Sequence, residues 1–289
     1  MNTVDIVAEI LKREGIEVLS CFPTTPIIES AAKAGIKPII CRQERVGVGI
    51  ADGYSRITNG NPLGVFAMQY GPGAENAYSG IATAYSDSTP LLLLPMGHPT
   101  DRQRVFPLYN AIDSFNTVNK QIEQITSSDS TDDVFRRAFS ALRTGRGGPV
   151  TVELPINLAS QEVSEESFHW PSNLSPTLSQ GNPADIQAAA RALCSAKYPV
   201  IHAGQGVLYA EATNELVELA ELLGVPVMTT LLGKSAFPEV HPLSLGTGSG
   251  VMPGPVYHFV RRSDVMFGIG CSFTKHGMSM NIPDGKTII

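Results

Sequence analysis

The sequence has little charge and no long apolar run. Charged residues make up 17% of the 289 residues, the formal net charge is −6, and lysine and arginine are scattered along the chain. This pattern lacks the basic patch typical of nucleic-acid binding, so no nucleic-acid partner is expected. No apolar stretch reaches the roughly 18–20 residues that a membrane-spanning helix needs. The first residues also lack the basic start and cleavage site of a signal peptide. We therefore expect a cytoplasmic protein with no membrane partner.

Cysteine and histidine are also scarce, and their spacing argues against a metal site or a disulfide framework. No two cysteines form a C-x-x-C pair, and the histidines show no ligand spacing. We expect reduced, mostly buried thiols and no metal held by this chain. A P-loop is absent, and the first strand turn lacks G-x-G-x-x-G, which sets aside a dinucleotide-binding dehydrogenase. The cysteines are Cys21, Cys41, Cys194 and Cys271.

What is present is a repeated alternation of amphipathic helices and short apolar strands, typical of α/β proteins. The alternation predicts two doubly wound parallel-sheet domains, at residues 1–160 and 183–289, with an irregular stretch at 98–121. The segment 161–182 is rich in Ser, Pro, Glu and Asn, contains the only tryptophan, Trp170, and has linker composition. The final residues, 285–289, read as the start of a strand, so we expect an incomplete second domain that a further segment or separate polypeptide completes.

Four segments directly follow predicted strands of the first domain. They are Pro23, Glu44, the turn 71–73 and His98. Because the carboxyl ends of parallel strands share one edge of a sheet, and ligands bind at that edge, we expect these residues to lie close together.

Several sequence blocks resemble one enzyme family. In order, they are RQE, ADGYSR, GPGAEN, GIATAYSDSTP, TGRGGP, VTVELPINL and GVPVMTTLLGKSAFPEVHPLSLG. Together they resemble the N-terminal half of thiamine-diphosphate enzymes, and they are most similar to the acetolactate synthase (acetohydroxyacid synthase) large subunit. The resemblance implies a pyrimidine-binding domain, a central domain, and decarboxylation of a 2-keto acid followed by ligation to an acceptor carbonyl. The alternatives are a 2-keto acid decarboxylase, another acyl-donor lyase of the family, or a non-catalytic subunit that retains the fold.

The resemblance gives Glu44 the catalytic role of hydrogen-bonding N1′ of the cofactor's aminopyrimidine. The apolar residues that follow it would supply a pocket in which a carboxyl can share a proton with a ring nitrogen. Taken alone, Glu44 also fits a solvent-facing glutamate at a helix start, and Gly71-Pro72-Gly73 fits an ordinary strand-to-helix turn. The resemblance implies that the cofactor is bound by Pro23, Gly71, Pro72, Gly73 and Asn76.

The substrate side departs from the family pattern. Pro23-Thr24-Thr25-Pro26 stands where acetolactate synthases have Pro-Gly-Gly, so two hydroxyls would narrow the site, or else cap the next helix. His98 and Pro107 stand where the family has pocket glutamines. His98 fits a proton relay or a hydrogen-bonded structural histidine. Phe106 and Lys120 match the family's pocket phenylalanine and lysine. The expected substrate pocket is therefore Thr24, Thr25, His98, Phe106 and Lys120.

The family holds the diphosphate and Mg²⁺ through a Gly-Asp-Gly…Asn motif, and no Gly-Asp-Gly occurs in these 289 residues. The resemblance therefore implies that a further segment or a partner chain holds Mg²⁺, in a homo- or hetero-oligomer whose site lies between chains. The glycine-rich turns at 204–206 and 246–255 are compatible with FAD binding, although such turns are also common structural features.

Overall fold

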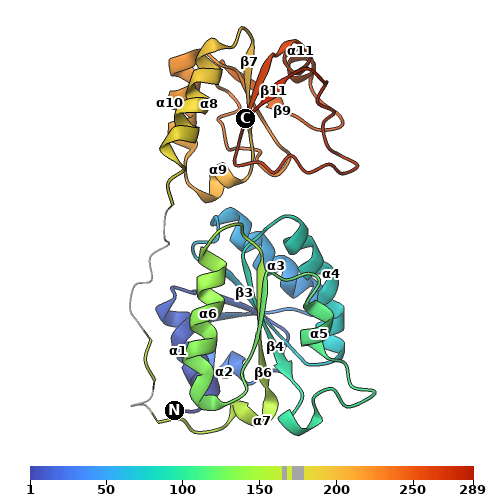
Figure 1. Ribbon diagram of the computed structural model, residues 1–289. Coiled ribbons are helices and arrows are strands. Elements are labelled where there is room, and N and C mark those ends of the chain that lie inside the picture. Colours follow the sequence, from blue (N-terminus) through green and yellow to red (C-terminus); the bar gives the residue numbers. More distant parts are fainter. Residues whose placement is uncertain (165–167, 171–178) are drawn as a thin grey trace. The chain divides into compact units, whose positions relative to one another are not determined.

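The computed structural model describes residues 1–164, 168–170 and 179–289. The chain divides into two compact units, Met1–Leu178 and Ser179–Ile289. Each unit contains one parallel sheet with helices on both faces (Figure 1). The predicted fold class, two doubly wound parallel α/β domains, is confirmed.

The first unit contains a six-stranded sheet in the order β2-β1-β3-β4-β6-β5. Every strand pair in it is parallel. The strands are β1 (Val18–Cys21), β2 (Lys37–Ile40), β3 (Gly64–Met68), β4 (Leu91–Gly97), β5 (Gln121–Gln124) and β6 (Pro149–Pro155). The helices are α1 (Thr3–Arg13), α2 (Ile27–Lys33), α3 (Glu44–Ile57), α4 (Pro72–Ser86), α5 (Ala111–Phe115), α6 (Thr131–Arg143) and α7 (Ile156–Ala159).

Strand β4 separates the two cores of the first unit. All seven of its residues are buried, as expected for a central parallel strand with helices on both faces. Leu92 and Leu94 point into the core under α1, α2 and α6. Leu91 and Leu93 point into the core under α3, α4 and α5. Figure 1 shows these two helix layers on opposite sides of the sheet.

Trp170 packs on the first unit. Its indole nitrogen donates to Glu14 Oε1 at 3.1 Å, its ring stacks edge-on against Phe139, and only 6% of it is exposed. The linker composition of 161–182 did not indicate this contact.

The second unit contains a five-stranded parallel sheet in the order β11-β10-β7-β8-β9. Helix α10 packs on one face and α11 on the other. The strands are β7 (Pro199–Ala203), β8 (Val227–Thr229), β9 (Ser244–Thr247), β10 (Val265–Ile269) and β11 (Thr287–Ile288). The helices are α8 (Pro183–Ser195), α9 (Gly206–Tyr209), α10 (Thr213–Leu223) and α11 (Gly254–Arg262).

Candidate active site

Glu44 is the first residue of α3 and follows strand β2. Only 6% of it is exposed, so its carboxyl lies inside the protein although it begins a helix. Its Oε2 accepts a hydrogen bond from Asn76 Nδ2 at 2.7 Å. Among the described residues, Oε1 receives no side-chain hydrogen bond. The arrangement therefore leaves one oxygen of a largely buried side chain free for a ligand, and the solvent-facing alternative does not describe it.

The turn before α4 brings backbone next to this carboxyl. Gly71 has φ 56° and ψ −114°, a conformation in which a side chain is strained. A Cβ placed on Gly73 would lie 3.0 Å from Glu44 Oε1 and 2.9 Å from the Cβ of Gln69. Pro72 occupies the first position of α4, where its missing N–H costs no hydrogen bond. The absent side chain of Gly73 thus keeps the space beside the Glu44 carboxyl open.

Small residues also let α3 lie close to the sheet and to α4. A Cβ on Gly47 would lie 2.2 Å from the ring of Phe66 on β3. A Cβ on Gly80 of α4 would lie 2.8 Å from Val48 of α3. These approaches fix the first turn of α3, and so the direction from which Glu44 enters the protein.

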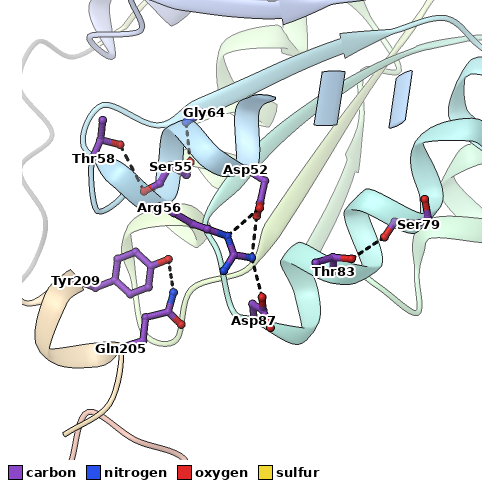
Figure 2. A network of polar contacts seen from close by, with 10 residues as sticks. All are labelled: Asp52, Ser55, Arg56, Thr58, Gly64, Ser79, Thr83, Asp87, Gln205 and Tyr209. Carbon is purple, nitrogen blue, oxygen red and sulfur yellow. Dashed lines mark hydrogen bonds and ion pairs between the residues drawn. The ribbon is translucent and has the colours of Figure 1, made fainter. Parts of the chain in front are cut away.

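Two ion pairs made by Arg56 hold the carboxyl-terminal end of α3. Arg56 Nε donates to Asp52 Oδ2 at 2.8 Å, and its Nη2 donates at 2.8 Å to Asp87, the residue after α4. Figure 2 shows this guanidinium between the two carboxylates. All three side chains are less than a third exposed, so the network stabilises the pairing of α3 with α4 more than a surface ion pair would.

Two cysteines lie beneath the Glu44 helix start. Burial raises the pKa of the Cys21 thiol to about 11, with the neighbouring Cys41 adding to the effect. Burial also raises the pKa of Cys41. Both thiols stay protonated near neutral pH and are poor nucleophiles.

The threonines after β1 differ from one another. Thr24 and Pro23 are exposed, whereas only 6% of Thr25 is exposed. The Thr25 hydroxyl is buried without a partner among the described residues. Helix α2 begins after Pro26 without a side-chain cap, so neither threonine takes the capping role weighed in the sequence analysis.

His98 lies at the end of β4 and lines a pocket together with Tyr70 and Gly71. The His98 and Tyr70 rings pack with their centroids 4.8 Å apart. His98 Nε2 is buried without a hydrogen-bond partner among the described residues. The pocket therefore borders the same glycine turn that approaches Glu44.

Glu153 of β6 lines this pocket too, and the sequence analysis did not select it. Its side chain is 5% exposed, and its Oε1 accepts from Gln124 Nε2 at 2.8 Å. Burial raises the pKa of its carboxyl, partly offset by the Gln124 hydrogen bond. A charged residue inside the apolar run PVTVELP, near the carboxyl end of a strand, is the signal that would have found it.

Two residues predicted for the substrate pocket lie outside the pocket that His98 lines. Phe106 is 94% exposed. The Lys120 ammonium donates to the backbone carbonyls of Ala141 and Thr144, at the carboxyl end of α6, where a cation favours the helix dipole. Neither residue lines the pocket at His98.

Two models of one protein family match parts of this chain. Residues 1–124 match the model of the thiamine pyrophosphate enzyme N-terminal TPP binding domain, and residues 186–289 match that of the thiamine pyrophosphate enzyme central domain. The chain belongs to the thiamine pyrophosphate enzyme family. The first match contains Glu44 and both segments that contact it, so the buried carboxyl lies in the family's cofactor-binding domain.

Curated relatives of this family cover nearly the whole chain. A probable acetolactate synthase large subunit from Methanococcus aeolicus is 34% identical over 95% of this chain and 47% of its own length. Its counterpart from Methanocaldococcus jannaschii is 33% identical over 95% of this chain and 48% of its own length. The acetolactate synthase isozyme 3 large subunit of Escherichia coli is 29% identical over 94% of this chain and 49% of its own length. The chain therefore spans about half the length of the curated relatives it matches.

The described residues fit one end of thiamine pyrophosphate better than the other. Glu44 Oε1, free of side-chain partners and open beside Gly73, can share a hydrogen bond with a polar atom of a ligand. Within the described ranges no group of three or more His, Cys, Asp or Glu is placed to hold a metal ion.

The same part of the chain contains no helix with both the length and the apolar character to cross a membrane.

Proposed function

We propose that this chain supplies the pyrimidine-binding half of a thiamine-diphosphate enzyme that decarboxylates a 2-keto acid and ligates the acyl group to an acceptor carbonyl. The observation that carries the proposal is the buried Glu44 carboxyl, oriented by Asn76 and left with one free oxygen beside Gly73. The acetolactate synthase names of the relatives favour ligation over decarboxylation alone.

Glu44 is the proposed catalytic residue. When bound, the cofactor would supply a carbanion that adds to a keto group and a positively charged ring that takes up the electron pair left by departing CO₂. Glu44 would share a proton with a ring nitrogen of the bound cofactor, and Asn76 keeps the carboxyl oriented by occupying its second oxygen. The glycine turn at Gly71–Gly73 gives a flat ring access to the carboxyl. Pro23 and the threonines that follow it border the same sheet edge.

A further segment or a partner chain is proposed to hold the diphosphate and Mg²⁺. The proposal is supported by the half-length match to the relatives and by the lack of a Gly-Asp-Gly motif. It places the complete site between polypeptides, in a homo- or hetero-oligomer. The exposed, small-residue side of α3, where Cβ atoms on Gly49 and Gly53 would meet nothing within 4 Å, leaves room for close approach by another chain.

The experiment compares Glu44→Gln with the wild-type chain in a 2-keto acid decarboxylation assay. The assay contains thiamine diphosphate, Mg²⁺ and the polypeptide that carries the Gly-Asp-Gly motif. Removing proton sharing should lower kcat about 10²–10⁴-fold. Glu29→Gln, at a side chain that is 79% exposed and paired with Lys33, is the matched control and should leave the rate unchanged.

Two results would overturn parts of this proposal. Wild-type rates in Glu44→Gln would remove the assigned catalytic role and leave a binding or regulatory subunit. Full activity of the 289-residue chain without any second polypeptide would remove the requirement for a partner. Product analysis separates free aldehyde, the product of a simple decarboxylase, from a ligated 2-hydroxy-3-keto acid.

A further inference from the structure

The pocket at the end of β4 contains polar groups without partners. His98 Nε2 and Gln103 Nε2 both line it, and both are buried without a hydrogen-bond partner among the described residues. Buried polar groups of folded proteins are almost always paired, in many cases with an ordered water. The cavity is about 10 Å³, the room that one water molecule needs. Its size and its two unpaired nitrogens therefore indicate a water rather than an organic ligand.

The third polar group is Glu153, and the fold makes space for it. A Cβ on Gly97, the last residue of β4, would lie 2.4 Å from Glu153 Oε1. Gln124 on the neighbouring strand β5 donates to that same oxygen. The described hydrogen bonds include none to Glu153 Oε2. The carboxyl is therefore held by one oxygen, and its other oxygen can accept from a water in the pocket.

The charge that faces the pocket comes from Glu153. It is the only acid among the described residues that line the pocket. Arg104 lines the pocket too, but its guanidinium pairs with Asp113 at 2.9 Å. Burial raises the pKa of the Glu153 carboxyl, and a hydrogen bond donated by a water to Oε2 would favour the charged form. The titratable or charged groups around the Glu153 carboxyl are Tyr70, His98, Arg104, Tyr109 and Asp113.

A carboxylate at this position affects which nitrogen of His98 carries the proton. A neutral imidazole has one N–H and one unprotonated nitrogen, and a nearby carboxylate favours the N–H on the side that faces it. A water that donates to a charged oxygen also becomes a better acceptor for that N–H. Gln103 Nε2, which can only donate, fits the same water oxygen. These preferences all favour the proton on His98 Nε2.

We propose that one buried water joins the Glu153 carboxylate to His98 Nε2 and Gln103 Nε2, and that Glu153 thereby holds the neutral His98 ring with its proton on Nε2. Glu153 is then a positioning residue, because it leaves Nδ1 of His98 as the nitrogen that can accept a proton. The pocket borders Gly71, in the turn that approaches Glu44. A use of this acceptor in turnover rests on the proposed function, whereas the water and the position of the proton do not.

The test uses the full chain labelled with ¹⁵N-histidine, without cofactor. Long-range ¹H–¹⁵N correlation spectra, recorded above the titration range of histidine, report which ring nitrogen of each imidazole carries the proton. His98→Asn identifies the His98 signals by their loss. The Nε2–H form of His98 should exceed the Nδ1–H form by at least about tenfold, a preference of about 1.4 kcal/mol. A crystal structure of the chain should show one water within hydrogen-bond distance of Glu153, His98 and Gln103.

Two variants act on the Glu153 carboxylate in different ways. Glu153→Gln removes its charge at nearly constant volume. Gly97→Ala keeps the charge, but the added Cβ displaces the carboxyl from its place. Each variant should lower the ratio of Nε2–H to Nδ1–H in His98 by at least about threefold. Glu123→Gln, on strand β5 beside Arg137 and outside the pocket lining, is the control and should leave the ratio unchanged.

The proposal is overturned if His98 of the wild-type chain favours Nδ1–H, if the crystal structure shows no water in the pocket, or if either folded variant keeps the wild-type ratio. An equal change in Glu123→Gln would also overturn it, since the charge at position 153 would then not be the cause. Circular dichroism checks that each variant is folded, and the wild-type ratio and the crystal structure decide the question if neither variant folds. Each of these results leaves the Glu44 assignment standing, because the samples contain no cofactor and no turnover is measured.

Discussion

Two glycines of α3 should respond in opposite ways to the same substitution. A Cβ at Gly47 would lie 2.2 Å from the ring of Phe66 and 2.8 Å from Cys41 Sγ, whereas a Cβ at Gly49 would meet nothing within 4 Å. Phe66 is fully buried, so its ring has no open space into which to move. The comparison of Gly47→Ala with Gly49→Ala therefore tests the packing that positions Glu44.

The magnitudes follow from two opposing effects. Replacing glycine by alanine inside a helix gains about 0.8–1 kcal/mol. Ordinary carbon contacts are about 3.5–4.0 Å, so Gly47→Ala forces a shift of more than ~1 Å, and overpacking of this kind costs about 1–3 kcal/mol. We expect Gly47→Ala to lower the free energy of unfolding by up to roughly 2 kcal/mol and Gly49→Ala to raise it by about 0.5–1 kcal/mol.

Urea denaturation of the full chain, followed by circular dichroism, measures both variants. Because the chain has two compact units, the change should fall on one of two transitions. In thermal melts the two variants should differ by roughly 5–10 °C in the transition of the first unit. Gly47→Ala as stable as Gly49→Ala would show that α3 does not lie against Phe66 as described, and Gly53→Ala, also free of contacts, should repeat the Gly49 result.

Three further outcomes are expected. Arg56→Leu leaves two partly buried carboxylates unpaired and should cost roughly 1–3 kcal/mol in urea denaturation, an effect that 0.5 M NaCl should not abolish. Burial lowers the pKa of His202 to about 4, below its ordinary 6.5, so stability should fall by up to about 3 kcal/mol between pH 6.5 and 4, and a slope unchanged in His202→Leu would refute this. Cys194 is exposed and should react first with a thiol reagent, whereas Cys21 and Cys41 should react only on unfolding. Mass spectrometry of the labelled peptides measures this order, and labelling of Cys21 or Cys41 before Cys194 would contradict the prediction.

The alternation of helices and strands predicted the fold well because buried parallel strands are nearly continuous apolar runs. Strand β4, with the sequence LLLLPMG, is the plainest case. Strand β5 was missed because its sequence, QIEQ, is polar and it lies at the edge of the sheet. Strand β9 could not be predicted from the sequence, because its four residues, SLGT, show neither an apolar run nor a clear alternation.

The candidate site was predictable wherever a residue directly follows a strand. Glu44, the turn at Gly71–Gly73 and His98 follow strands β2, β3 and β4 of one parallel sheet, so the topology alone brings them to one edge. Glu153 was missed because it lies within a strand, and only three-dimensional packing reveals that Gly97 leaves room for it. The contacts of Lys120 could not be predicted from the sequence either, because they depend on where helix α6 ends in space.

The shared space of Gly97 and Glu153 links two positions on different strands. An acid at 153 requires that position 97 have no side chain, and any side chain at 97 would displace the acid. Removing the acid, as in Glu153→Ala, should create a void that Gly97→Ala then fills, so the double variant should be more stable than the sum of its parts predicts. The two positions can therefore be changed only as a pair, and a survey of the residues tolerated there is best made by randomising both codons together.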